Sequence, residues 1–446
     1  METARYTLLI RNVTAVDPAG KAAHVLPGHD LAIAGNRIVA VRPTGQIGAD
    51  EASEVIDGAG MAALPGLINT HAHTAMVLFR GAAEDVPIEQ WFNDYIWSME
   101  TNLTPDDVAW GMRLGLAEMI ESGVTTVADH YFQMHLIAEA VEESGLRAHL
   151  APTMFGADPR AELTAAAAFA GRWHGAAGGR IQAWLGPHAP YTCSPEFLRQ
   201  TAHEARALGL GCHIHVSESA KQVEASIKDH GVTPIRFLQQ LGLMDGRLLC
   251  AHATHATPED IELLASSGAG VAHCPKTFLK LASGIAPVTA MRAAGVPVGL
   301  GSDGAASNNT LDILEQMRLG AMLQKHERAD ARALPLGDAL AMATSEGARA
   351  LGQESELGRL ASGYLADVIL VRLDGAHVQP VHDVAAALVY AARAGDVDTT
   401  IVDGRVLMRG RKLLTLDKGA ILREVAGRAK RLGQRDHGRS LQTYRA

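Results

Sequence analysis

The middle of the chain alternates short hydrophobic runs with longer amphipathic stretches. Runs such as VTTVAD have the length of buried strands, and stretches such as PEFLRQTAHEARALG have the spacing of apolar residues that is typical of helices. Repeated strand-then-helix units indicate a parallel sheet. About eight such units fit between Leu64 and residue 355, which predicts an α/β fold with a (β/α)8 barrel of the TIM type.

The two ends of the chain carry a different pattern. Residues 6–62 hold short strand-like runs separated by Gly, Pro and Asn, and short strands return after residue 355 in ADVILVRLD and TTIVDGRVLMRG. We therefore expect the ends to form one small β-sandwich domain beside the barrel. The expected boundaries are 1–63 for its first part, 64–355 for the barrel, and 356–446 for its second part with a basic C-terminal helix whose charges face solvent.

Composition limits the possible functions. The 446 residues are 47% hydrophobic, enough for a large core without disulfides, and the four cysteines form no CxxC pair, as expected of reduced, buried thiols. The net charge of −9 argues against nucleic-acid or anionic-membrane partners. The start has no signal-peptide pattern, and no apolar run is long enough to span a bilayer. We expect a cytoplasmic homo-oligomer that acts on a small molecule.

Polar side chains stand at the ends of the predicted barrel strands. His71 and His73 end the first run, and residues two apart in a strand point to the same side, so both can face one metal ion. Four further polar residues end later runs: His215, Glu218, His252 and Asp303. Because burying unpaired imidazoles and carboxylates is costly, core packing alone does not explain the whole set. The carboxyl ends of barrel strands meet at one mouth, where a metal site is expected.

The motifs PGLINTHAH, HIHVSE, AHATH and GSDGAASNN, in this order and spacing, resemble the amidohydrolase superfamily, in its cytosine-deaminase-like branch. The resemblance implies four ligands of one divalent metal, zinc or sometimes iron: His71, His73, His215 and Asp303. It also implies that Glu218 and His252 are catalytic without being ligands. No lysine stands where the binuclear members carry a carbamylated lysine, so a single metal is expected.

A metal held in this way lowers the pKa of bound water towards about 7 and supplies hydroxide at neutral pH. Displacing an amino group from a ring carbon also requires proton transfers to and from water, ring nitrogen and leaving amine. We assign deprotonation of the water to Asp303, protonation of the ring nitrogen to Glu218, and orientation of the water to His252.

The stretches MVLFRGAAEDVPIEQW, GPHAPYTCS and LKLASGIAPV bring the resemblance closer to deaminases of S-adenosylhomocysteine and 5′-methylthioadenosine. This resemblance implies that His188 contacts the purine, that Ser307 lies near the substrate, and that Glu100 binds the ribose hydroxyls. A carboxylate that accepts from two hydroxyls is a strong partner, since charge-assisted hydrogen bonds are roughly twice as strong as neutral ones.

Three positions depart from that pattern. Pro152 stands where the adenosylhomocysteine deaminases have an arginine, and Lys276 and Phe278 stand where they have small or amide residues; Arg160 is a candidate replacement for the arginine. Two alternatives remain. One is an aminohydrolase or chlorohydrolase of another N-heterocycle, such as an s-triazine or a guanine-like or pterin-like ring, and the other is a non-catalytic scaffold.

The glycines Gly299, Gly301 and Gly304 spell GxGxxG after a hydrophobic run, as dinucleotide-binding sites do. The motif occurs late in the chain, and Asp303 would place a carboxylate against a pyrophosphate. A dinucleotide site is therefore not expected.

Overall fold

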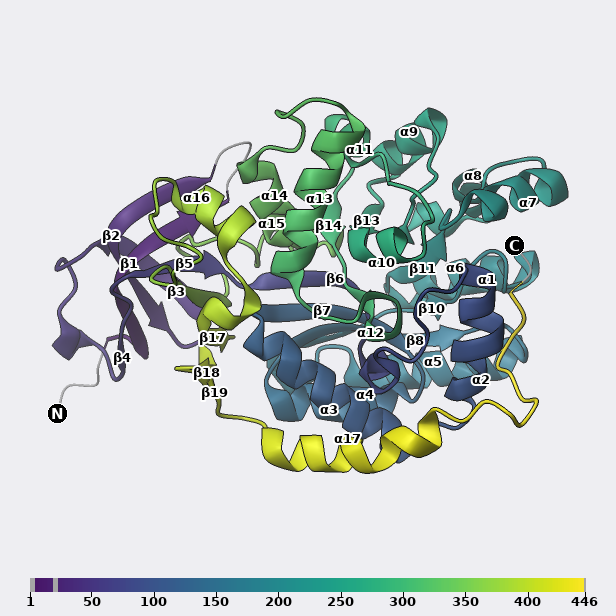
Figure 1. Cartoon of the computed structure of the whole chain (residues 1–446), viewed down its shortest axis with the longest axis horizontal. Coiled ribbons are helices and arrows are strands. Elements are labelled where there is room, and N and C mark those ends of the chain that lie inside the picture. Colours follow the sequence, from purple (N-terminus) through teal and green to yellow (C-terminus); the bar gives the residue numbers. More distant parts are fainter. Residues whose placement is uncertain (1–4, 19–22, 445–446) are drawn as a thin grey trace.

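A parallel sheet forms the centre of the computed structural model, which describes residues 5–18 and 23–444 (Figure 1). Along its main path the strands follow the order β10-β8-β7-β6-β14-β13-β12-β11, with β9 beside β8 and β15 beside β6, and each of these pairs is parallel. The strands are β6 (Leu67–His73), β7 (Val124–Tyr131), β8 (Arg147–Met154), β9 (Ile181–Ala183), β10 (Gly186–Pro187), β11 (Cys212–Val216), β12 (Leu248–His252), β13 (Gly270–His273), β14 (Val298–Leu300) and β15 (Asp303–Gly304). The α/β fold with a parallel sheet is confirmed.

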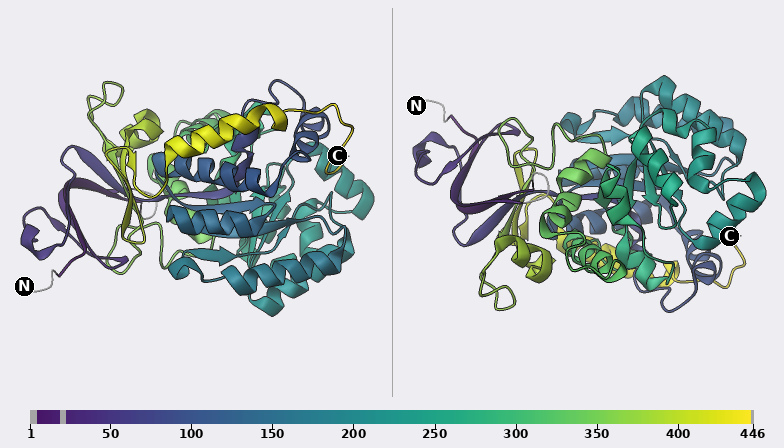
Figure 2. Two further views of the ribbon diagram at one scale, coloured as in Figure 1. Left: turned by 90° about the horizontal axis from the view of Figure 1, so that it is seen from below. Right: turned by 90° about the horizontal axis from the view of Figure 1, so that it is seen from above.

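Backbone hydrogen bonds connect the two ends of this path. The N–H of Leu185 donates to the carbonyl of Gly211 at 2.8 Å, and the N–H of His215 donates to the carbonyl of His188 at 3.0 Å. Helices cover the outer side of the sheet (Figure 2). They are α3 (Pro105–Glu121), α4 (Met134–Ser144), α5 (Pro159–Trp173), α6 (Pro195–Leu208), α7 (Ala220–His230), α8 (Pro234–Gln240), α9 (Pro258–Ser267), α10 (Pro275–Lys280), α11 (Val288–Ala293), α12 (Ala305–Asn308), α13 (Ile313–Glu327), α14 (Leu336–Ala343) and α15 (Ser345–Ala350).

The two ends of the chain share a second, mixed sheet of nine strands, as expected of a common domain. Its N-terminal strands are β1 (Leu8–Asp17), β2 (His24–Ala34), β3 (Arg37–Pro43), β4 (Val55–Asp57) and β5 (Met61–Pro65), and its C-terminal strands are β16 (Val368–Arg372), β17 (Val397–Val402), β18 (Arg405–Arg409) and β19 (Lys412–Leu413). The antiparallel pair β5–β16 joins the halves, with Pro65 opposite Val368. The sandwich form of this domain and its exact boundaries stay predictions.

A single residue, Gly66, separates β5 of the second sheet from β6 of the central sheet. A Cβ atom at this position would lie 2.1 Å from Oγ1 of Thr125, so only glycine fits where the chain passes between the sheets. The glycines of the GxGxxG motif have a similar role. A Cβ at Gly299 would lie 2.3 Å from Cγ2 of Thr70, and one at Gly301 would lie 2.7 Å from Sγ of Cys274. These glycines serve close strand packing.

The C-terminal helix α17 (Lys418–Leu432) packs along α3 of the central domain (Figure 1). Asp107 of α3 is buried and accepts from Arg431 at 2.6 Å and from Arg428 at 3.1 Å. These two arginines pair with the acidic start of α3, whereas Arg423 and Lys430 of α17 are exposed to solvent, as the sequence predicted. The chain then continues to the mouth of the central sheet, where α1 (Ile88–Gln90), the π-helix Trp91–Ile96 and α2 (Trp97–Glu100) lie.

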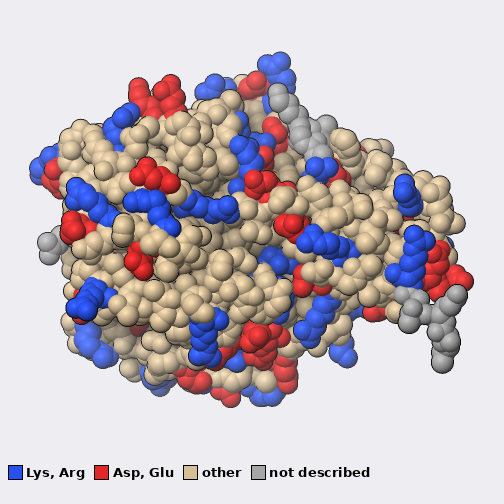
Figure 3. Space-filling model, turned by 180° about the vertical axis from the view of Figure 1, so that it is seen from behind, with Lys and Arg blue, Asp and Glu red and all other residues tan. Residues whose placement is uncertain are grey.

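Other expectations from composition can be compared with the structure. All four cysteines are free and buried, as predicted. Acidic and basic side chains alternate over the face in Figure 3, without a large area of one sign. Within residues 5–18 and 23–444, we find no helix with the length and hydrophobicity needed to cross a bilayer.

Candidate metal centre and active site

Three imidazoles and one carboxylate converge at the mouth of the central sheet. Nε2 of His71 lies 3.4 Å from Oδ1 of Asp303, and Nε2 of His73 lies 3.3 Å from the same oxygen. Nε2 of His73 also lies 3.1 Å from Nε2 of His215. The histidines come from the ends of β6 and β11, and Asp303 opens β15, which pairs with β6. The strand ends thus bring together residues 232 positions apart, as the sequence predicted.

Hydrogen bonds on the far side of each ring leave its Nε2 free to bind a metal. Nδ1 of His73 donates to the carbonyl of His130, and Nδ1 of His215 donates to the carbonyl of His188 at 2.8 Å. A carbonyl can only accept, so the proton of each neutral ring sits on Nδ1 and the lone pair on Nε2. Partners of this kind orient metal-binding histidines and raise their basicity.

The donor set fits a divalent ion. Nε2 of His71 is buried and has no hydrogen-bond partner among the described residues, so it has an unused lone pair or proton. Burial lowers the pKa of His71 and of His215, which keeps both rings neutral as metal binding requires. Burial would raise the pKa of Asp303, but the neighbouring rings of His71 and His73 hold it well below its usual range. Burial would lower the pKa of His73, but its contacts with Asp303 raise it to about 9, so a metal bound there would displace a proton. Three imidazoles and a carboxylate suit zinc or iron.

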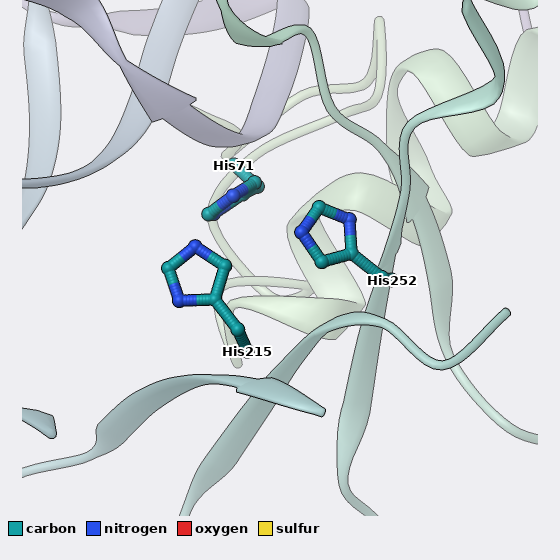
Figure 4. A group of neighbouring side chains, drawn as sticks. All are labelled: His71, His215 and His252. Atoms are coloured by element: carbon teal, nitrogen blue, oxygen red, sulfur yellow. The ribbon is translucent and has the colours of Figure 1, made fainter. Parts of the chain in front are cut away.

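His252 ends β12 and lies beside the same centre (Figure 4). Its ring centroid is 5.1 Å from that of His71 and 5.4 Å from that of His215, and Figure 4 shows the three rings turned towards one another. The backbone of His252 has φ 81 and that of Asp303 has φ 58. Left-handed conformations cost roughly 1 kcal/mol or more in non-glycine residues and occur preferentially at functional sites. Burial lowers the pKa of His252 to about 3, so its ring is neutral.

Glu218 lies in the wall of a cavity above the centre. The carboxylate is buried, and burial raises its pKa to about 7. Oε2 accepts from Nε2 of Gln222 at 3.1 Å and from the hydroxyl of Tyr191 at 3.4 Å. A carboxyl group with a pKa near neutrality can both give and take a proton at physiological pH, as a general acid must.

Glu100 ends α2 and lines the same cavity, where Oε1 accepts from the hydroxyl of Tyr131 at 2.6 Å. Burial raises the pKa of Glu100 to about 7. A buried carboxylate with unused acceptor positions is able to bind hydroxyl groups of a ligand.

His188 and Ser307 also line the cavity. Nδ1 of His188 lies 2.9 Å from Oγ1 of Thr192, and burial lowers the pKa of the ring to about 3. The hydroxyl of Ser307 donates to Oδ2 of Asp303 at 2.9 Å. Ser307 therefore fixes the carboxylate whose other oxygen faces the histidines.

Arg160 is the one predicted site residue that lies away from both the cavity and the cluster of histidines. It lies at the start of α5 and lines a separate surface hollow with Glu196 and Arg199. The lining residues of the site cavity include the carboxylates of Glu100, Glu218 and Asp303, and none of them is lysine or arginine.

The three positions that depart from the family pattern have structural roles. Lys276 pairs with Glu315 at 2.8 Å, outside the cavity lining. Phe278 is buried with its ring edge against His252 at 4.9 Å between centroids. Pro152 lies in β8, close to Gly186 of β10. A Cβ atom added at Gly186 would lie only 2.5 Å from the carbonyl oxygen of Pro152.

The sequence analysis missed several residues of the site. Nε2 of His213 lies 2.8 Å from Nδ1 of His71, and the spacing of His213 and His215 in β11 repeats the HxH pattern that singled out the first pair. That repeat was a usable signal. Gln222 and the aromatic residues of the cavity wall carry no comparable pattern: Trp91, Phe92, Trp97, Phe132, Phe155 and Tyr191.

The chain is similar to known sequences over most of its length. The model of the amidohydrolase family matches residues 62–407. The chain is 49% identical over 428 residues to a 5-methylthioadenosine/S-adenosylhomocysteine deaminase of Desulforudis audaxviator, covering 95% of this chain and 99% of that relative. It is 46% identical over 424 residues to a protein of the same name from Moorella thermoacetica, covering 94% of this chain and 98% of that relative.

Solved structures agree with this comparison. An adenosine deaminase from Xanthomonas campestris with bound zinc has a TM-score of 0.91 and 33% identity, covering 96% of this chain and 98% of that chain. Atrazine chlorohydrolase from Arthrobacter aurescens, complexed with zinc, has a TM-score of 0.87 and 28% identity, covering 95% of this chain and 100% of that chain.

Proposed function

This chain belongs to the amidohydrolase family, and from that premise we propose that it is a metal-dependent deaminase of adenine nucleosides. It is a hydrolase of C–N bonds that removes the amino group of an adenine-type ring, with 5′-methylthioadenosine, adenosine and S-adenosylhomocysteine as its substrate class. The observation that carries the proposal is the convergence of the His71, His73 and Asp303 side chains below a cavity whose wall holds Glu218.

We assign four ligands to one divalent ion, most simply zinc: His71, His73, His215 and Asp303. When bound, such an ion lowers the pKa of water towards about 7 and so provides a nucleophile at neutral pH. Oδ2 of Asp303 is occupied by the Ser307 hydroxyl, which leaves Oδ1 turned to the histidines.

Two side chains transfer protons and a third orients the water. Asp303 would accept a proton from the attacking water and pass it to the leaving amine, which departs as ammonia when the C–N bond breaks. The neutral ring of His252 would orient that water by a hydrogen bond. Glu218 donates to the ring nitrogen next to the carbon under attack, because its pKa near 7 allows it to be protonated before the step and charged after it.

The cavity walls favour a nucleoside over a charged relative. Glu100 is placed to accept from the two ribose hydroxyls, and His188 and Ser307 lie near the purine. The aromatic wall suits an apolar 5′ substituent, and the described lining contains no cation for a phosphate or amino-acid carboxylate. We therefore expect kcat/KM for 5′-methylthioadenosine and for adenosine to be at least as high as for S-adenosylhomocysteine. Arg160 would reach the substrate only from outside this cavity.

An aminohydrolase or chlorohydrolase of another N-heterocycle is the second candidate, because the fold is also similar to atrazine chlorohydrolase. Glu100 favours the first candidate, since a triazine offers no diol to a buried carboxylate. A non-catalytic scaffold would not need three histidines with oriented Nε2 atoms beside a carboxylate.

Three features of wider organisation belong to the same proposal. We propose that the parallel sheet forms a closed barrel. The hydrogen bonds of Leu185 with Gly211 and of His215 with His188, which join its two end strands, support this proposal. The β-sandwich with boundaries at 1–63 and 356–446, the homo-oligomeric state and the cytoplasmic location remain predictions from the sequence.

The test is a steady-state comparison of six compounds with the zinc-loaded protein, following ammonia release. They are 5′-methylthioadenosine, adenosine, S-adenosylhomocysteine, 2′,3′-dideoxyadenosine, melamine and guanine. Loss of the diol should lower kcat/KM about tenfold to several hundredfold, because Glu100 is then left buried without its partners. Turnover limited to melamine or guanine would contradict the nucleoside assignment, and the absence of any ammonia release would contradict deamination.

A further inference from the structure

The C-terminal segment of the chain reaches the proposed proton donor. Residues 433–444 leave α17 and run along the elements that carry the cavity wall. The hydroxyl of Ser98 donates to the carbonyl of Arg435 at 3.3 Å, and the N–H of Leu441 donates to the carbonyl of Trp97 at 3.2 Å. The segment is thus held against α2, which ends at Glu100.

Tyr444 is fixed from two sides at the end of this segment. Asn93 of the π-helix accepts from the Tyr444 N–H at 2.8 Å and donates to its carbonyl at 3.2 Å. The ring of Tyr444 stacks on Phe92 with centroids 4.9 Å apart and an angle of 10° between planes. Tyr444 is 4% exposed, so its side chain is enclosed by the protein.

The hydroxyl of Tyr444 completes a closed hydrogen-bond network around Gln222. Nε2 of Gln222 donates to Oε2 of Glu218 at 3.1 Å and to the Tyr444 hydroxyl at 3.2 Å. Oε1 of Gln222 accepts from the backbone N–H of Glu218 at 3.0 Å, which fixes the orientation of the amide. The Tyr444 hydroxyl also lies 3.3 Å from Oγ of Ser219, within hydrogen-bonding distance.

Every hydrogen-bonding position of the Gln222 side-chain nitrogen is used in this network, and one of its two protons is directed at Glu218. Oε2 of Glu218 is therefore engaged by Gln222 and Tyr191, whereas Oε1 is left for a ligand in the cavity. A shift of about 1 Å in a reacting group can cost up to roughly 100-fold in rate, so a fixed carboxyl orientation matters for proton donation.

We propose that Gln222 and Tyr444 are positioning residues for Glu218, and that the C-terminal segment is for this reason a part of the active site. This inference rests on the proposed role of Glu218 as proton donor. Tyr444 acts through Gln222: without the tyrosine hydroxyl, the second amide proton loses its partner and only the two hydrogen bonds to Glu218 hold the amide. The pair acts on the chemical step, and neither residue belongs to the cavity lining that contacts substrate.

The experiment is a double-mutant cycle with Tyr444→Phe, Gln222→Leu and the double variant in the zinc-loaded full-length enzyme. Tyr444→Phe keeps the stacked ring and removes only the hydroxyl. We expect kcat for 5′-methylthioadenosine to fall about threefold to tenfold, the worth of one net hydrogen bond, and Gln222→Leu to lower it at least about tenfold. KM should stay within about twofold, and one equivalent of zinc should be retained.

The double variant is the deciding measurement. Because Tyr444 acts through Gln222, its kcat should equal that of Gln222→Leu alone, instead of the product of both effects. Tyr390→Phe is the matched control, since this exposed tyrosine of the π-helix Ala387–Ala391 lies far along the chain from the network. Additive losses, an effect confined to KM or zinc content, or unchanged turnover of Tyr444→Phe would each overturn the proposal.

Two further measurements separate this inference from the proposed function. Absence of deaminase activity in the parent enzyme would refute the function itself. The crystal structure of Gln222→Leu tests the inference without turnover: the Glu218 carboxyl should occupy a new rotamer or several, and an unchanged single rotamer would overturn the positioning role.

Discussion

Nδ1 of His71 lies 2.8 Å from Nε2 of His213, inside the central sheet. For Nε2 of His71 to bind a metal, its Nδ1 must carry the proton, and His213 must accept it. His213 is buried, and burial holds the pKa of its ring well below the usual range, so it is neutral and able to accept. With the proton on Nδ1 of His71, this contact is a hydrogen bond that stabilises the metal-binding tautomer.

Replacing His213 should therefore weaken metal binding. We expect His213→Leu to lower zinc affinity about 10- to 100-fold, the usual effect of losing such a partner, measured by competition with a chelator. His213→Gln, whose amide oxygen can accept the same hydrogen bond, should lie between. The matched control is His149→Leu, which removes another buried strand histidine that contacts Trp184 and none of the proposed ligands. Equal zinc affinity of His213→Leu and the parent would show that another group sets the tautomer.

Removal of a ligand should have a stronger effect. His71→Ala takes away a buried Nε2 atom that has no other partner, and we expect the purified variant to lose both its metal and its deaminase activity. Elemental analysis gives the metal content, and His203→Ala on the exposed side of α6 is the control. An active variant without bound transition metal would contradict the metal assignment.

Glu218→Gln should separate metal binding from proton transfer. The amide keeps the size of the side chain but cannot donate an acidic proton, so we expect a normal zinc content with a fall in kcat of at least about 100-fold. Turnover close to that of the parent would mean that the ring nitrogen receives its proton by another route.

The buried carboxyl group of Glu100, which we assign to ligand binding, is expected to lower the free energy of unfolding. Its pKa is about 7 in the folded protein, against 4.5 for the ordinary group, because the carboxyl is buried. As pH rises from about 4.5 to 7, the unfolded chain loses this proton first, so rising pH favours unfolding. Glu100→Gln removes this effect and should be more stable than the parent by the order of 1–3 kcal/mol at about pH 8.

The pH dependence makes this prediction specific. The gain in the free energy of unfolding of Glu100→Gln should shrink as pH falls and should vanish below about pH 3.5, where the carboxyl is protonated in both states. Chemical denaturation of both proteins across this range measures it. A variant that is less stable than the parent at about pH 8 would show that Glu100 contributes more through its bond with Tyr131 than burial takes away.

The cavity lining predicts the preferred 5′ substituent. Because the described lining residues include three carboxylates and no cation, adenosine 5′-monophosphate should be turned over at least about 100-fold less efficiently than 5′-methylthioadenosine. S-Adenosylhomocysteine should not exceed 5′-methylthioadenosine in kcat/KM. A clear preference for S-adenosylhomocysteine would indicate that a cation such as Arg160 moves to the cavity when the substrate binds.

The sequence by itself determined the α/β class, the parallel sheet and the residues that gather at its mouth. The carboxyl ends of parallel strands meet at one edge of the sheet, so a polar residue at such an end is expected at the mouth. This rule made four residues predictable: His71, His73, His215 and Asp303. The glycines after β14 could be separated from a dinucleotide motif for the same reason, since Asp303 stands among them.

Only the tertiary structure decided which residues surround and support those side chains. The contact of Gln222 with Tyr444 joins positions 222 apart through a segment without regular structure, and no periodicity links them. Arg160 illustrates the reverse case, because a position at the start of a helix does not reveal the direction of a long side chain, and here it lies at a different hollow. Strand ends obey a rule of geometry, whereas loops, tails and side-chain directions follow from the packing of the whole molecule.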